Sequence, residues 1–276
     1  MKKLLIIILS VFITISFGKV KFGFLNDWFS SDNDNDYCTV EMEKEIEISK
    51  GTHLYLKNQN GYVKIESWNE DKVKVDVTMK SRKGEDELNK VQIMAELNGD
   101  DLEIVTKRLK RDAKVTVNYT IYAPSYLIID NIKSSNGSIT IEDMKGDMRV
   151  STSNGSIVFK NIDGNIVGES SNGTIKAINC SSIDKLDTSN GSIYAEIKEV
   201  KNNISLDTSN GSITIKVNEN LDLDLELDTS NGKVSIEDLN LDVRKKKRTY
   251  FRGSLNNGGY LIKGDTSNGS IKLSSL

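Results

Sequence analysis

The sequence predicts an all-β protein built as a parallel β-solenoid, in which each repeat of the chain forms one coil stacked on the next. One phrase, Thr/Ser-Ser-Asn-Gly, recurs through the second half of the chain at spacings of 18, 18, 18, 20, 21 and 37 residues. The residues after each copy alternate between apolar and polar, as in a half-buried strand. A period near 18–20 residues indicates that one small unit has been repeated, and the last spacing is close to two periods.

Each repeat reads as two short strands joined at an Asn-Gly corner. After Gly191, the apolar Ile193, Ala195 and Ile197 alternate with polar neighbours, and an apolar residue at a fixed offset before each asparagine marks the other strand. The two strands are followed by a looser polar turn such as 163–165. The predicted corner residues are Asn136, Gly137, Asn154, Gly155, Asn172, Gly173, Asn190, Gly191, Asn210, Gly211, Asn231, Gly232, Asn268 and Gly269.

Two architectures fit these repeats. Asn-Gly is a strong signal for a two-residue hairpin turn, so the repeats could form a long antiparallel β-hairpin meander. A hairpin has no need for identical Ser and Thr beside the turn, whereas stacked coils align identical side chains about 4.8 Å apart, where Asn side chains can form hydrogen-bonded ladders. The sequence therefore favours the solenoid, with the glycine expected to supply a positive φ at the corner.

The chain is predicted to contain four regions. Residues 1–18 resemble a secretory signal peptide, with Lys2 and Lys3 before an apolar run that is short for a membrane span. Residues 19–36 read as a linker. Residues 37–125 contain strand-like segments with irregular spacing, including a degenerate first repeat at Asn60 and a strand that ends at Pro124, and are predicted to form an N-terminal β cap. The regular repeats occupy residues 126–276.

The composition narrows the possible partners. The formal net charge is −3, which disfavours general binding to nucleic acid. An exported protein can form disulfides, and Cys38 and Cys180 could form one bridge or remain two inert thiols. Contact with a membrane is expected only through the N-terminal leader if that leader is not cleaved. The oligomeric state is left open.

Neither a catalytic site nor a cofactor site is predicted. His53 is the only histidine, which argues against zinc motifs with paired histidines and against a Ser-His-Asp triad. Asp32, Asp34 and Asp36 resemble the start of a calcium loop, but Tyr37 stands where that loop needs glycine, so a solvated linker is the better interpretation.

One acidic column stands three residues before the corner asparagines. Stacked coils would bring these carboxylates together, and their repulsion would then be screened by solvent, relieved by lysines such as Lys185, or neutralised by a cation. Solvation is the favoured interpretation, and bound calcium is the alternative. The column consists of Glu169, Asp187, Asp207, Asp228 and Asp265.

A basic cluster interrupts the repeats between residues 239 and 261. It is interpreted as a solvated loop or an edge strand whose lysines prevent edge pairing. It is also the best candidate in the sequence for a contact patch. The cluster consists of Arg244, Lys245, Lys246, Lys247 and Arg248.

Three sequence motifs occur in the same order as in a known family. They are residues 65–75, which contain Trp-Asn-Glu-Asp, residues 117–124, which end in proline, and the repeated Ser-Asn-Gly-Ser-Ile-Thr-Ile. Over residues 40–276 the chain resembles the β-strand-repeat "putative adhesin" domain family of bacterial envelope proteins. The resemblance implies a right-handed parallel β-solenoid-like fold and an envelope location, and it carries over no catalytic residues.

The preferred hypothesis is a non-enzymatic exported protein of the cell envelope or surface that presents its stacked repeats for binding, with an envelope protein or a surface polysaccharide as partner. The first alternative is an accessory protein in envelope stress or signalling that docks a membrane protein. The second is a polysaccharide-active β-helix enzyme, which would need a cluster of carboxylates on one face.

Overall fold

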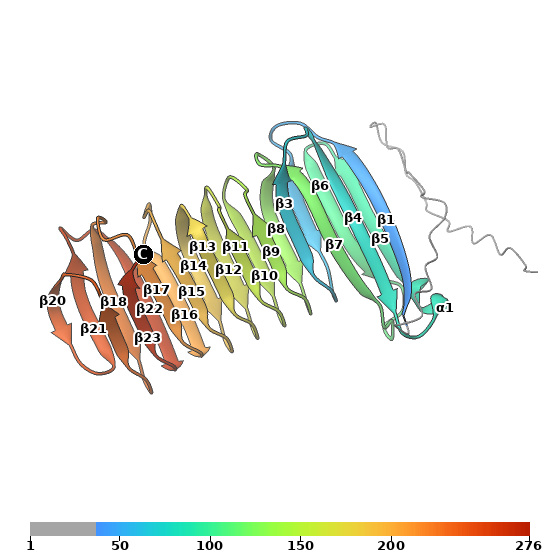
Figure 1. Cartoon of the computed structure of the whole chain (residues 1–276). Coiled ribbons are helices and arrows are strands. Elements are labelled where there is room, and N and C mark those ends of the chain that lie inside the picture. Colours follow the sequence, from blue (N-terminus) through green and yellow to red (C-terminus); the bar gives the residue numbers. More distant parts are fainter. Residues whose placement is uncertain (1–36) are drawn as a thin grey trace, which may run out of the picture.

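The computed structural model describes residues 37–276 as a stack of coils formed by two long, facing β-sheets (Figure 1). The leader, the linker and the predicted calcium-loop residues Asp32, Asp34 and Asp36 lie outside the described residues. Apolar side chains from both sheets form one continuous core between them, from Ile46 at one end to Val234 at the other. The fold is therefore all-β, and the expectation of a β-solenoid is confirmed.

Sheet A has 11 strands. In spatial order they are β1 (Cys38–Glu47), β4 (Lys72–Ser81), β7 (Thr116–Pro124), β3 (Val63–Trp68), β9 (Ile139–Glu142), β11 (Ile157–Lys160), β13 (Ile175–Cys180), β15 (Ile193–Ile197), β17 (Ile213–Val217), β23 (Ile271–Ser275) and β19 (Val234–Glu237).

Sheet B has 12 strands. In spatial order they are β20 (Leu241–Lys246), β21 (Tyr250–Leu255), β18 (Leu223–Thr229), β22 (Tyr260–Asn268), β16 (Ile204–Asn210), β14 (Ser182–Thr188), β12 (Asn165–Ser170), β10 (Met148–Thr152), β8 (Ile128–Ser134), β2 (His53–Lys57), β6 (Asp101–Arg108) and β5 (Val91–Asn98).

The repeats stack in parallel and in register. Each Asn-Gly corner carries the chain from a strand of sheet B to a strand of sheet A. Equivalent residues of successive coils then pair with each other: Ile157 pairs with Ile139 of one neighbouring coil and with Ile175 of the other. The alternative of an antiparallel hairpin meander is wrong, because the two strands that flank each corner belong to different sheets. Stacking in register also places large residues against small ones: a Cβ atom on Gly168 would lie 2.9 Å from the ring of the buried Phe159.

A ladder of amide groups runs along the corners. The side-chain Nδ2 of each repeat asparagine donates to the Oδ1 of the asparagine on the neighbouring coil, at distances of 2.7–2.9 Å. In spatial order the ladder contains Asn136, Asn154, Asn172, Asn190, Asn210, Asn268 and Asn231. Beside it, the hydroxyl of Thr188 donates to the Gly173 carbonyl of the neighbouring coil at 2.9 Å, and other coils repeat this bond. These bonds explain why Asn and Ser/Thr are repeated and not only Gly.

The corner glycines serve a different purpose from the one expected. None of the seven has a positive φ, so the expectation that they supply a left-handed corner is wrong. They are needed because the coils approach closely. A Cβ atom on Gly173 would lie 1.9 Å from the carbonyl oxygen of Gly155, and a Cβ atom on Gly191 would lie 2.1 Å from that of Gly173. A clash with the backbone of the next coil excludes every other residue type.

Residues 38–124 extend the stack beyond the regular repeats. The strands β2 and β3 form a coil around Asn60 that stacks on β8 and β9, so the degenerate first repeat is confirmed. The chain then leaves this coil, adds β4, β5, β6 and β7 at the end of the stack with several antiparallel pairings, and returns to β8.

The last coil in the sequence is not the last coil in space. Strand β22 lies between β16 and β18 in sheet B, and β23 lies between β17 and β19 in sheet A, all in parallel. The chain therefore skips one place in the stack, builds β18 to β21 beyond the gap, and fills the gap with residues 260–275. This arrangement explains the spacing of 37 residues between the last two copies.

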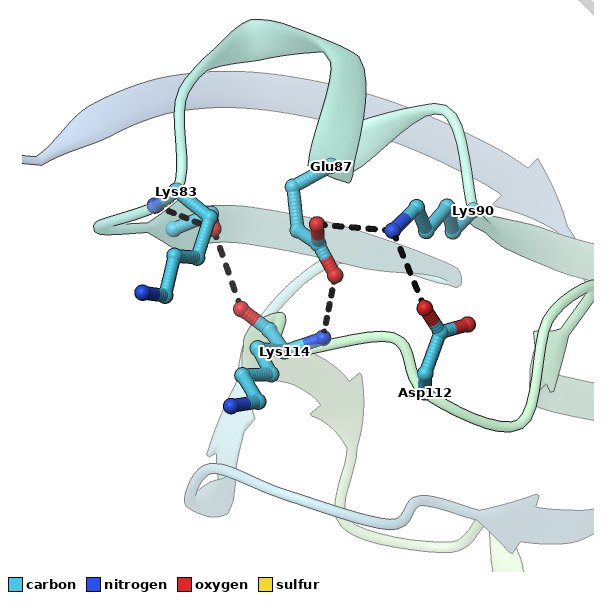
Figure 2. A network of polar contacts seen from close by, with 6 residues as sticks. Lys83, Glu87, Lys90, Asp112 and Lys114 are labelled. Carbon is cyan, nitrogen blue, oxygen red and sulfur yellow. Dashed lines mark hydrogen bonds and ion pairs between the residues drawn. The ribbon is translucent and has the colours of Figure 1, made fainter.

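A polar network fastens the short helix α1 (Glu85–Leu88) to the loop before β7 (Figure 2). Oε1 of Glu87 accepts the backbone N–H of Lys114 at 2.7 Å, and Oε2 accepts from Nζ of Lys90 at 2.9 Å. Lys90 also reaches Asp112 at 3.4 Å. The Lys114 amide first, and then the Lys90 ammonium, hold the pKa of Glu87 below its ordinary value.

We expect Glu87→Gln to weaken this network in a pH-dependent way. Because the pKa of Glu87 is lower in the folded state, its carboxylate stabilises the fold above the ordinary value of 4.5, and that stabilisation is lost as the pH falls through the lowered pKa. Thermal unfolding of both proteins between pH 3 and pH 7 tests this. The melting temperatures should differ at pH 7 and converge at the acid end, and a constant difference would show that the charge of Glu87 is not involved.

Candidate functional site

The predicted acidic column is present on the solvent face of sheet B. Strand pairing places Glu169 beside Asp187, Asp187 beside Asp207, Asp207 beside Asp265, and Asp265 beside Asp228. The column is therefore a continuous line of five carboxylates on adjacent strands, in which the inserted β22 supplies the fourth member. The sequence predicted the members but not this order.

Neighbouring side chains on the same face offset the repulsion within the column. Nζ of Lys185 lies 3.0 Å from carboxylate oxygens of both Glu169 and Asp187. Lys263 contacts Asp265 at 2.6 Å. Of the three ways to offset the repulsion that the sequence left open, ion pairs with lysines are therefore present in the structure. Within residues 37–276, no three acidic, His or Cys side chains gather closely enough to hold a metal ion.

Replacing Lys185 with methionine should lower the free energy of unfolding by about 0.5–1 kcal/mol at low salt, because Glu169 and Asp187 would then repel each other at a half-exposed site. Salt screens such repulsion, so the difference should shrink as ionic strength rises. Urea unfolding at two salt concentrations measures it. Lys216→Met is the control, since Lys216 has no ion pair within the described chain. If the loss of unfolding free energy does not depend on salt, packing of the lysine side-chain carbons, and not charge, explains the effect.

The acidic column borders a shallow groove that follows the Asn-Gly corners along sheet B. We call it the corner groove. It consists of two adjoining hollows of about 320 and 540 Å³ that share Asp187. Carboxylates and serines line the first hollow, whereas the second ends at Lys57 and Lys133. Polar and charged residues therefore line the whole groove, which is acidic towards the C-terminal coils and basic at its N-terminal end.

The predicted basic cluster lies at the end of the stack. Strand β20 is the edge strand of sheet B and pairs only with β21, which agrees with the interpretation as an edge strand. Arg244 contacts Asp224 at 3.3 Å, and Lys245 lies over the ring of Tyr250. For Lys245, Lys246, Lys247 and Arg248, no carboxylate of the described chain lies within ion-pair distance.

His53 and the cysteines have structural surroundings. Nδ1 of His53, in β2, lies 2.8 Å from Oδ2 of Asp130. The hydroxyl of Tyr55 donates to the same oxygen at 2.5 Å, which raises the pKa of Tyr55 to about 12. Cys38 and Cys180 are free thiols, and burial raises the pKa of Cys180 to about 11, as expected for an inert thiol.

A second polar ladder, at the opposite corner of the coils, escaped the sequence analysis. Asn161 donates through Nδ2 to Oδ1 of Asp143 at 2.7 Å, and Asn179 donates in the same way to Asn161. All three have a positive φ, between 54° and 59°, which Asn and Asp tolerate better than most residues. Their spacing of 18 residues, at the C-terminal ends of three successive strands, is the signal that could have revealed them.

Comparisons with known proteins identify similar chains. The family model described as Toastrack DUF4097 matches residues 39–274. Among solved structures, a putative adhesin from Bacteroides fragilis has 14% identity and a TM-score of 0.47, with 86% of this chain and 97% of that chain covered. A putative lipid binding protein from Parabacteroides distasonis has 15% identity and a TM-score of 0.40, with 86% and 96% covered. No curated protein matches the sequence.

Proposed function

The chain belongs to the Toastrack family, and on that premise we propose that it is a non-enzymatic, exported protein of the cell envelope or surface that binds a partner along its stacked coils. The observation that carries the proposal is the in-register stack itself. Parallel pairing from β2 to β18 repeats the same surface positions on neighbouring strands of sheet B. Such a stack offers a long, rigid contact surface.

The corner groove is the part of this surface that we assign to binding. Its carboxylates accept hydrogen bonds, its serine hydroxyls donate and accept them, and both types recur from coil to coil. A partner with regularly spaced hydroxyl or amide groups can therefore bind to several coils at once. A surface polysaccharide or an extended segment of another envelope protein has this chemistry.

The location is tested on cells that produce the protein. Protease and antibody accessibility is measured on intact cells and again after permeabilisation. Exposure on intact cells is the expected result for a surface protein with an adhesin role. Protection until permeabilisation would contradict the surface role and support an internal envelope protein that docks another protein, whose partner crosslinking would identify.

The groove is tested by binding of the purified protein to isolated cell envelopes. We expect the triple variant Asp187→Asn, Asp207→Asn, Asp265→Asn to bind at least tenfold more weakly, because it removes three adjacent carboxylates. The control, Glu142→Gln, Glu196→Gln, Glu237→Gln, removes the same charge from sheet A and should bind as before. Equal binding by all three proteins would exclude the corner groove as the contact surface.

Within residues 37–276, no helix is long and apolar enough to span a bilayer.

A further inference from the structure

The two sheets end unevenly, so that one sheet overhangs the other at each end of the stack. Counted outward from the coil of β2 and β3, sheet A adds β7, β4 and β1, whereas sheet B adds only β6 and β5. Counted outward from the coil of β18 and β19, sheet B adds β21 and β20, whereas sheet A adds none. Strand β1 therefore overhangs at one end, and β21 with the edge strand β20 at the other. The two ends are far apart in Figure 1.

The two overhanging strands carry opposite charges. On β1, the solvent-facing positions are glutamates from Glu41 to Glu47, and these four side chains are exposed. On β20, the exposed residues include Asp242, Arg244, Lys245 and Lys246, so the strand has a net positive charge. Lys246 pairs with the buried Phe251 of β21 and therefore lies on the inner face. Lys245 and Lys246 have no carboxylate of the described chain within ion-pair distance, whereas Lys72 and Lys74 contact Glu45 and Glu43. The basic charge of β20 is thus largely left for a partner outside the chain.

The two strands β1 and β20 also both carry partly exposed apolar residues on their inner faces. Leu241 and Val243 pair with Leu255 and Gly253 of β21, which face the core, so they lie on the inner face of sheet B. Val243 is 50% exposed because sheet A provides no strand opposite β20. On β1, Val40 and Met42 occupy the inner face and are only partly buried.

We propose that the chain associates head to tail with a second copy of itself, through edge-to-edge pairing of β20 with β1 of the next copy. Aligned in this way, the inner apolar residues of the two strands lie side by side, and on the outer face Arg244 and Lys245 of one copy lie beside the glutamates of the other. Among the described strands, a pair of copies still has one unpaired β1 and one unpaired β20, so the contact is heterologous and open and continues into filaments. This inference does not depend on the proposed binding role of the corner groove.

Sedimentation velocity of the full chain, over a range of concentrations, tests the proposal. We expect the mean mass to rise with concentration at low salt and to fall toward the monomer in high salt, because exposed charge pairs are screened. A chain that stays monomeric at every concentration in low salt would overturn the proposal. So would association that high salt leaves unchanged.

Charge reversal gives a sharper test. The variant Lys245→Glu, Lys246→Glu has two acidic ends, and the variant Glu41→Lys, Glu47→Lys has two basic ends, so each alone should stay monomeric. An equimolar mixture should associate again, because each acidic end then meets a basic one. The control Lys176→Glu, Lys216→Glu changes sheet A far from both ends and should associate like the unmodified chain. Circular dichroism checks that every variant is folded. Association of either end variant alone, or failure of the mixture to associate, would overturn the pairing.

Discussion

Replacing Gly173 with alanine is expected to lower the free energy of unfolding by about 3 kcal/mol, the upper end of the usual cost of overpacking. The added Cβ would lie 1.9 Å from the carbonyl oxygen of Gly155 and 2.4 Å from its carbonyl carbon. These atoms belong to the backbone of the adjacent coil, which is fixed by hydrogen bonds to coils on both sides. The two coils must therefore separate, which also strains the amide ladder at Asn172. Urea unfolding measures the loss.

Glycine could be required at the corner for a positive φ or for close approach of the coils, and a second glycine outside the corners distinguishes these two explanations. Gly99 has a φ of +63° and nothing within 4 Å of an added Cβ. Gly99→Ala should therefore cost only the conformational penalty of a left-handed residue, about 1 kcal/mol. Gly173→Ala should be clearly the more destabilising of the two. If Gly99→Ala costs as much or more, close approach of the coils is not what requires glycine at the corner.

Removing residues 260–276 is expected to reduce stability even more than Gly173→Ala does, but only in the C-terminal coils of the stack. Strands β22 and β23 lie between coils on both sides, and Ile262, Ile271 and Leu273 are fully buried. Each such side chain contributes roughly 1.5–3 kcal/mol by burial. Without the inserted coil, β18 and β19 lose the only parallel partners they have in either sheet.

Hydrogen exchange shows where the truncated chain has lost its structure. Strands β18, β19 and β21 should lose protection, whereas β10 to β14 should keep it, because those coils contact only their own neighbours. The protected coils serve as the internal control. Retained protection of β18 would mean that it pairs directly with β16, so that the coils can close the gap by themselves.

The sequence was sufficient to predict the coils because the stack repeats the same local chemistry. Identical Asn and Ser/Thr beside each glycine distinguished a stack from a hairpin meander, and the acidic column followed from the same alignment. The positive φ expected at Gly173 was wrong, because the familiar meaning of Asn-Gly is local and the requirement here comes from Gly155, one coil away.

The order of the coils could not be predicted. The copy at Asn268 is chemically equivalent to its neighbours, so nothing local assigns it a place between Asn210 and Asn231. The residues that line the corner groove are also brought together only by pairing of strands that are distant in the sequence. Its basic end was missed because Lys57 and Lys133 lie 76 positions apart in the chain, and only the pairing of β2 with β8 places them together.

The inserted coil also bears on how the protein is made. Synthesis proceeds from the N-terminus, and most of the stack can form as soon as each new coil is added to the one before. At β17 this sequential assembly has to pause, because the neighbouring coil is encoded further along the chain, by residues 260–276. Residues 221–256 must wait, without these neighbours, until residues 260–276 have been synthesised. A product that ends before residue 260 therefore lacks the inserted coil, and it exposes unpaired strands that proteases and chaperones can recognise.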